Sequence, residues 1–169
     1  MPKGKWIGIW ICFIGLSGVS IAQPPDTVRV QILHSNDVYG QLLRQGVDGD
    51  QKGGMAARVH LIRRLQKEYP TMVLDAGDAL GPGTLSAWDV GKTMIGAMRL
   101  AGYTAMVPGN HEFDYGLSAL SERRKEGAFP FLAVNLRGKQ QKELPFEGYR
   151  TEIVEGVKIG LIGVVSASL

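Results

Sequence analysis

The stretch that decides the fold is TAMVPGNHE, residues 104–112, in which a short apolar run gives way to a turn and a polar cluster. The run 104–107 has the composition of a buried strand, and Gly109 permits a sharp turn directly after it. Asn110 and His111 follow at once, so the strand ends in side chains that carry nitrogen and oxygen donors. In open α/β sheets such groups gather at the carboxyl ends of the strands, where sites form.

Two stretches earlier in the chain repeat this order of strand, turn and polar cluster. A strand with a period of two residues is expected over 27–33, and His34-Ser35-Asn36-Asp37 follows it. A nearly continuous apolar strand is expected over 71–74, and Asp75-Ala76-Gly77-Asp78 follows that one. Because parallel strands end at one edge of a sheet, we expect these clusters to meet Asn110, with Asp75 as a turn or supporting residue rather than a ligand.

The remaining patterns predict an α/β fold in which helices flank a largely parallel sheet that finishes in an antiparallel pair. Helices are expected over 54–69, 90–100 and 117–125, further strands over 104–107 and 129–134, and a hairpin with strands 149–154 and 157–165. The last strand reads as buried, and the chain stops four residues after it. We therefore expect the sheet to be incomplete at the C-terminus.

The N-terminus has the pattern of a secretory signal. Lys3 and Lys5 precede an uncharged run over 6–20, and the small residues before Gln23 suit cleavage after Ala22. Glycines and serines within the run argue against a stable membrane span. We expect a signal peptide over 1–22, a mature chain over 23–169, and export to the periplasm or the exterior.

The composition agrees with a single globular domain, because 44% of the 169 residues are hydrophobic and 21% are charged. Loss of the signal removes two lysines and lowers the net charge from +3 to +1, so the basic pI gives no reason to expect a nucleic-acid partner. The single cysteine, Cys12, leaves with the signal, and the mature chain can form no internal disulfide.

Together, Leu33-His34-Ser35-Asn36-Asp37, Gly77-Asp78 and Gly109-Asn110-His111-Glu112-Phe113-Asp114 resemble the first three motifs of the calcineurin-like metallophosphoesterases, in their 5'-nucleotidase branch. The resemblance extends from about Thr27 to Val165. It implies a layered sheet flanked by helices, two divalent metal ions (Mn, Zn, Co, Fe or Mg) and hydrolysis of a small phosphoester such as a nucleoside monophosphate by a metal-activated water.

The resemblance also implies roles for individual residues. Asp37 would bind the first metal, Asp78 would bridge both metals, and Asn110 would bind the second. His111 would donate to the phosphoryl or leaving oxygen, and Asp114 would orient its imidazole. Each ligand taken singly has a structural alternative as a helix cap or turn residue, and Asp114 could cap the helix that begins near residue 117.

Two departures from the family pattern bear on activity. The first motif usually reads Asp-x-His, whereas here Tyr39 stands in place of the histidine, and a neutral phenol is a poor ligand for zinc or manganese. No histidine follows His111, although the family's remaining metal histidines lie further downstream. We expect the chain to be the N-terminal portion of a metallophosphoesterase domain and inactive alone. The alternative is an inactive exported protein that binds a nucleotide or a partner.

Overall fold

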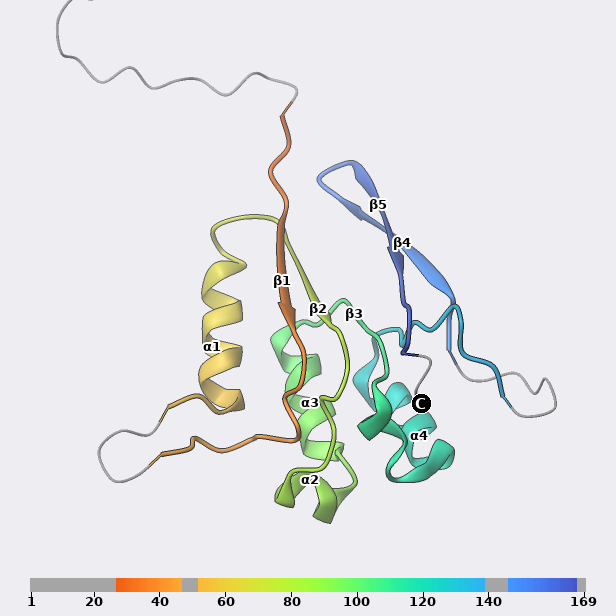
Figure 1. Ribbon diagram of the computed structural model, residues 1–169. Coiled ribbons are helices and arrows are strands. Elements are labelled where there is room, and N and C mark those ends of the chain that lie inside the picture. Colours follow the sequence, from red (N-terminus) through yellow and green to blue (C-terminus); the bar gives the residue numbers. More distant parts are fainter. Residues whose placement is uncertain (1–26, 47–51, 139–145, 167–169) are drawn as a thin grey trace, which may run out of the picture.

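The computed structural model describes residues 27–46, 52–138 and 146–166 (Figure 1). The predicted signal peptide over 1–22 lies outside the described residues. Within the described ranges, no helix has the length and apolar character needed to cross a bilayer.

A parallel sheet of three strands organises the structure, with β1 (Gln31–Ser35), β2 (Thr71–Asp75) and β3 (Ala105–Met106) in that spatial order. The register pairs Ser35 with Asp75, and Asp75 with Met106. All three strands therefore end at one level, and the loops that follow them leave the same edge of the sheet. This confirms the parallel arrangement that the sequence predicts.

Helices α1 (Met55–Leu65), α3 (Lys92–Ala101) and α4 (Gly116–Gly127) pack in sequence, α1 against α3 and α3 against α4 (Figure 1). Their apolar side chains join the strands in one main core. Buried members of that core include Met94, Ile95, Met98, Leu120, Val73, Met106 and Phe131. The strand edge that carries the polar loops thus rests on a packed support.

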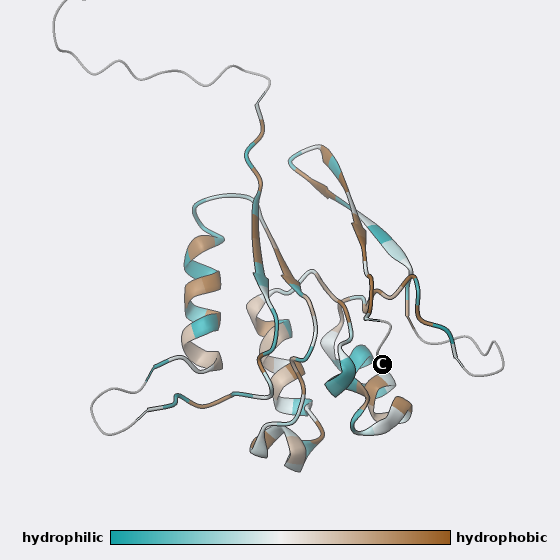
Figure 2. Ribbon diagram, in the orientation of Figure 1, coloured by the Kyte–Doolittle hydropathy of each residue, from teal (hydrophilic) through white to brown (hydrophobic). Residues whose placement is uncertain are grey.

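The antiparallel hairpin forms as predicted, from β4 (Tyr149–Val154) and β5 (Val157–Ile162). Glu155 and Gly156 make the two-residue turn with φ values of 48° and 78°, the left-handed conformation that tight hairpin turns require. The prediction that this last strand is buried is wrong. Both strands contain apolar residues (Figure 2), and among them Ile153 and Ile162 are exposed. In β5 Leu161 is buried in the smaller core cluster, and Ile159 is partly buried against that cluster.

Several element boundaries differ from the predictions, each for a local reason. The first strand begins at Gln31, not at residue 27, because its pairing starts only where the Gln31 N–H donates to the Pro70 carbonyl, next to β2. The first helix ends at Leu65, because the N–H groups of Lys67 and Glu68 donate to carbonyls three residues earlier instead of four, ahead of Pro70. Proline disfavours helical conformation in the residue before it.

The segment from Asp75 to α3 contains a helix that the sequence pattern does not predict, α2 (Thr84–Asp89). Val90 and Gly91 follow it with φ values of 58° and 75°, and these left-handed residues separate α2 from α3.

The prediction of a strand over 129–134 is wrong. Among the described residues, that segment forms isolated bridges, Phe131 to Met106 and Leu132 to Glu147, and no strand.

Candidate functional site

The loops after β1 and β2 run side by side and bring the first two motifs together. The Asp37 N–H donates to the Gly77 carbonyl at 2.9 Å, and the Tyr39 N–H donates to the Asp78 carbonyl at 2.8 Å. These bonds extend the parallel pairing of the strands into the loops. Asp37 and Asp78 consequently sit in adjacent loops at one edge of the sheet.

The loop after β3 closes against the second loop through two glycines. A Cβ on Gly77 would lie 2.8 Å from the Gly109 nitrogen, and a Cβ on Gly109 would lie 2.7 Å from the Asp78 nitrogen. Neither approach is possible for a larger residue. The His111 N–H then donates to Asp78 Oδ1 at 3.0 Å. The structure therefore brings the loops of Asp37, Asp78 and Asn110 together, as the sequence predicts.

Glu112 supports this junction, a role that no sequence signal indicates. Its carboxylate is 1% exposed and accepts four backbone N–H groups, from Asp78, Ala79, Leu80 and Gly109. Burial raises the pKa of Glu112, and the hydrogen bonds from the backbone oppose that rise.

His111 and Asp114 form a hydrogen-bonded pair. His111 lies in the short 3₁₀ helix η1 (Asn110–Phe113), and Asp114 follows it directly. The His111 Nδ1–H donates to Asp114 Oδ2 at 2.8 Å, which leaves Nε2 available to a ligand. This hydrogen bond raises the pKa of His111. The helix α4 begins at Gly116 with no side-chain cap, so the geometry of Asp114 is that of a partner to the imidazole rather than of a helix cap.

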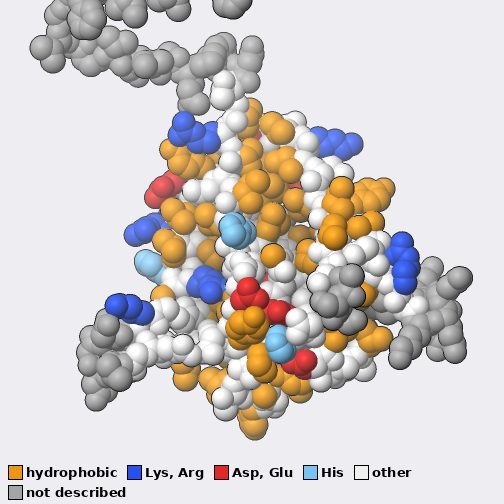
Figure 3. Space-filling model, in the orientation of Figure 1, with side chains coloured by type: hydrophobic (Ala, Val, Ile, Leu, Met, Phe, Trp, Pro, Cys, Tyr) orange, Lys and Arg blue, Asp and Glu red, His pale blue; other side chains and the backbone are white. Residues whose placement is uncertain are grey.

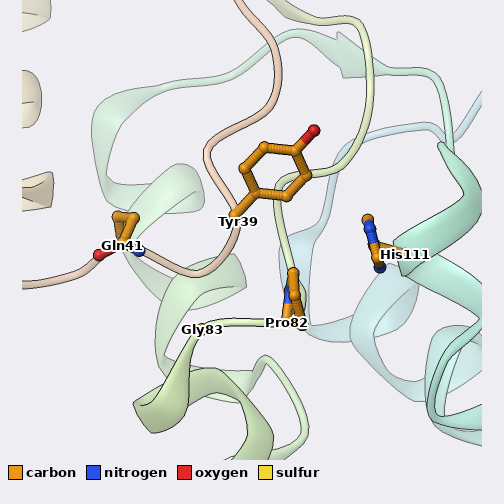
Figure 4. Close-up of a pocket in the computed structure, with 5 residues that line it drawn as sticks. All are labelled: Tyr39, Gln41, Pro82, Gly83 and His111. Carbon is orange, nitrogen blue, oxygen red and sulfur yellow. The ribbon is translucent and has the colours of Figure 1, made fainter.

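A pocket of about 350 Å³ opens beside this pair, lined by Tyr39, Gln41, Pro82, Gly83 and His111 (Figure 4). The rings of Tyr39 and His111 lie 5.5 Å apart at 85°. Acidic and histidine side chains gather on this face of the molecule (Figure 3). The pocket thus offers an aromatic wall and an imidazole next to a negatively charged edge.

Tyr39 contacts the first motif through its hydroxyl, which donates to Asp37 Oδ1 at 2.9 Å. That hydrogen bond raises the pKa of Tyr39, so the phenol stays protonated at neutral pH. Asn36 Nδ2 donates to the other Asp37 oxygen. The side chain of Tyr39 therefore acts on Asp37 as a hydrogen-bond donor.

The donor set suits a divalent cation only in part. Asp37, Asp78 and Asn110 supply carboxylate and amide oxygens at one edge, and no lysine or arginine among the described residues pairs with either carboxylate. Within the described ranges, however, no three His, Cys, Asp or Glu side chains are grouped to hold a metal. The described residues could therefore supply part, but not all, of the coordination shell of a divalent ion.

Asp75 lies beneath the site as a turn residue. Its carboxylate is 3% exposed, accepts the Gly77 N–H at 2.9 Å, and accepts the Ser35 hydroxyl, which also contacts the Tyr103 hydroxyl. Burial raises the pKa of Asp75 to about 6. Asp75 thus fixes the Gly77 turn from below.

Comparison with known proteins gives consistent results. The family profile for calcineurin-like phosphoesterases matches residues 30–162. The chain is 32% identical to a snake venom 5'-nucleotidase from Gloydius brevicauda over 92% of the chain and 27% of that protein. It is also 32% identical to protein UshA from Yersinia enterocolitica, over 88% of the chain and 28% of that protein.

Solved structures agree. The 5'-nucleotidase precursor from Thermus thermophilus matches with a TM-score of 0.69 and 27% identity, over 80% of this chain and 28% of that one. The NAD nucleotidase from Haemophilus influenzae matches with a TM-score of 0.69 and 30% identity, over 80% of this chain and 26% of that one. The chain thus spans little more than a quarter of the length of these relatives.

Proposed function

The chain belongs to the calcineurin-like phosphoesterase family, and we propose from this that its protein is a metal-dependent phosphoester hydrolase of the 5'-nucleotidase type. The observation that carries the proposal is the convergence of the Asp37, Asp78 and Asn110 loops beside the His111–Asp114 pair. Oxygen donors and a hydrogen-bonded imidazole at one sheet edge are the parts that phosphoester hydrolysis needs.

Each residue then has a proposed role. Asp37 and Asn110 would each hold a divalent ion, and Asp78 would serve as a ligand to both. When bound, such ions lower the pKa of a water and offset negative charge on the phosphate. His111 Nε2 donates to the phosphoryl or leaving oxygen as charge builds there, while Asp114 keeps the proton of Nδ1 and the orientation of the ring.

We propose a nucleoside monophosphate or a related nucleotide as the substrate. The relatives named 5'-nucleotidase and NAD nucleotidase support this class. The Tyr39 ring, which stands across the pocket from His111, provides an apolar surface next to the phosphate position (Figure 4). That surface suits a ligand with an organic part attached to its phosphate.

The proposed organisation is a signal peptide over 1–22 followed by 23–169 as the N-terminal portion of a metallophosphoesterase domain. The partial donor set among the described residues supports the second part of this organisation, because a complete metal shell would need further ligands. We propose that the protein is exported, and that residues 1–169 alone do not hydrolyse phosphoesters. Mass spectrometry of the secreted protein should give Gln23 as the first residue, and an N-terminus at Met1 would refute cleavage.

The test of the hydrolase is the full-length gene product assayed with manganese or cobalt and a nucleoside monophosphate. We expect His111→Ala to lower the rate by roughly 10²- to 10⁴-fold, the usual contribution of a positioned proton donor. His60→Ala is the matched control, because His60 is exposed on α1. An equal loss in both variants, or an unchanged rate in His111→Ala, would refute the role of His111.

One observation favours a second function, nucleotide binding without hydrolysis. The Tyr39 hydroxyl bonds Asp37 Oδ1, at the motif position where the family usually has a metal-binding imidazole. If the full-length product releases no phosphate with any divalent ion but binds the nucleotide in calorimetry, the binding function stands and the hydrolase is refuted.

A further inference from the structure

The carboxylate of Glu112 is an anion without a cation. Among the described residues, no lysine, arginine or histidine forms an ion pair with it. Four backbone N–H groups solvate it instead, at 2.6 to 2.9 Å. A buried charge persists only when its hydrogen bonds are satisfied, so this arrangement depends on all four donors staying in place.

The two oxygens of this carboxylate have different partners. Oε1 accepts from Ala79 and Leu80, both in the loop after β2. Oε2 accepts from Asp78 at 2.8 Å and from Gly109 at 2.6 Å, and Gly109 belongs to the loop after β3. A single oxygen therefore ties the loop of Asp78 to the loop of Asn110.

A second link runs in the opposite direction. Asp78 Oδ1 accepts the His111 N–H, so Asp78 is both held by the β3 loop and bound to it through its own side chain. The Asp78 backbone has a φ of 55°, which is costly for a residue other than glycine. The Glu112 hydrogen bond to the Asp78 N–H offsets that cost at the residue proposed to lie between two metal ions.

We infer that Glu112 is a positioning residue that sets the spacing of Asp78 and Asn110 and thereby the affinity for divalent metal ions. The inference rests on the proposed function, because it concerns the same metal site. Among the described residues, every hydrogen bond of the Glu112 carboxylate is with a backbone N–H of the two ligand loops. Groups that orient metal ligands in this way change metal affinity by roughly 10- to 100-fold when they are replaced.

The test is Glu112→Gln in the full-length gene product, titrated with Mn²⁺ by calorimetry in the absence of nucleotide. Glutamine keeps the shape but sets an amide NH₂ against one pair of backbone donors. We expect the dissociation constant to rise by roughly 10- to 100-fold. Glu112→Asp retains the charge on a shorter side chain, and its affinity should fall between those of wild type and Glu112→Gln.

Arg123→Ala is the control that distinguishes an effect on metal affinity from a general loss of stability, because it destabilises the protein away from the site. Arg123 is buried on α4 and pairs with Glu126. Saturating Mn²⁺ should raise the Tm of wild type and of Arg123→Ala equally and raise that of Glu112→Gln less, since ligand stabilisation follows affinity. If Glu112→Gln does not fold, the titration of Glu112→Asp decides the question.

The outcomes are distinct. Wild type that binds no Mn²⁺ overturns the proposed function together with this inference. Wild type that binds Mn²⁺, with unchanged affinity in Glu112→Gln or, where that variant does not fold, in Glu112→Asp, overturns the inference alone. An equal loss of affinity in Arg123→Ala also overturns it, because stability would then explain the effect.

Discussion

Gly109→Ala adds one methyl group at the point where the β2 and β3 loops meet. The Gly109 φ of −85° suits any residue, so the change introduces no backbone strain. The new Cβ would lie closest to Asp78 Oδ1 and 2.7 Å from both Asp78 Cγ and the Asp78 nitrogen, against an ordinary contact of 3.4 Å or more, so the carboxylate and the loop that carries it must recede by at least about 0.7 Å. A displacement near 1 Å at a reacting centre costs about 10²-fold in rate.

We therefore expect Gly109→Ala to lower kcat by roughly 10- to 100-fold and to lower the free energy of unfolding by about 1–3 kcal/mol through overpacking. Gly96→Ala is the matched control. A Cβ on Gly96, within α3, would meet nothing within 4 Å. That change should stabilise the helix by about 0.5–1 kcal/mol and leave activity unchanged.

The assay is nucleoside monophosphate hydrolysis by the full-length gene product at saturating Mn²⁺, with unfolding followed by circular dichroism. The refuting result is wild-type kcat in Gly109→Ala, which would mean that Asp78 does not act where the structure places it. An equal loss of rate in Gly96→Ala would show that any added methyl group disturbs the protein, and would refute the steric argument as well.

Three further changes are predicted. Asp75 has a pKa of about 6 against 3.8 unfolded, so the free energy of unfolding should fall by about 3 kcal/mol as pH rises from 3.8 to 6, and Asp75→Asn should flatten that slope in urea titrations. Arg123→Ala removes donors to the Asp89 and Val90 carbonyls and should lower the same free energy by about 2 kcal/mol, measured by urea unfolding. Tyr39→His should tighten Mn²⁺ binding in calorimetry, because imidazole is the better ligand, and unchanged affinity would refute a metal next to residue 39.

The placement of the site was predictable from strand ends. Asp37, Asp78 and Asn110 each follow an apolar run, and the parallel register brings the ends of those runs to one level. The hairpin was predictable for a similar reason, since Glu155-Gly156 is a strong local turn signal between two extended runs. In both cases the information lies within a few consecutive residues.

The predictions of secondary structure fail where contacts with residues distant in the sequence decide the conformation. In α2 the large apolar residues Leu85 and Trp88 are 42% and 86% exposed. The helix therefore has no buried apolar face, and so no apolar periodicity from which the sequence could predict it. The segment 129–134 has a strand's composition, yet only isolated bridges form, because each available neighbour pairs with it at a single point. Local propensity cannot report the absence of a partner strand.

Glu112 escaped prediction for a related reason. Its acceptors are matched to backbone N–H groups more than thirty residues away, at Asp78 to Leu80, and backbone groups leave no trace in the sequence. A glutamate beside Asn110 and His111 resembles one more polar residue of a ligand loop. The burial of the Glu112 side chain, which the sequence does not show, is what distinguishes a supporting residue from a metal ligand here.

The loops of the site combine unfavourable conformations with dense backbone bonding. Asp37, Tyr39 and Asp78 all have φ values between 51° and 55°, and each such non-glycine residue costs about 1 kcal/mol or more. Hydrogen bonds to neighbouring loops hold all three N–H groups. The conformation is thus fixed by the protein's own backbone and by Glu112. The proposed binding of metal to these loops would then need little rearrangement, and substitutions at the glycines or at Glu112 should weaken it even though they remove no ligand.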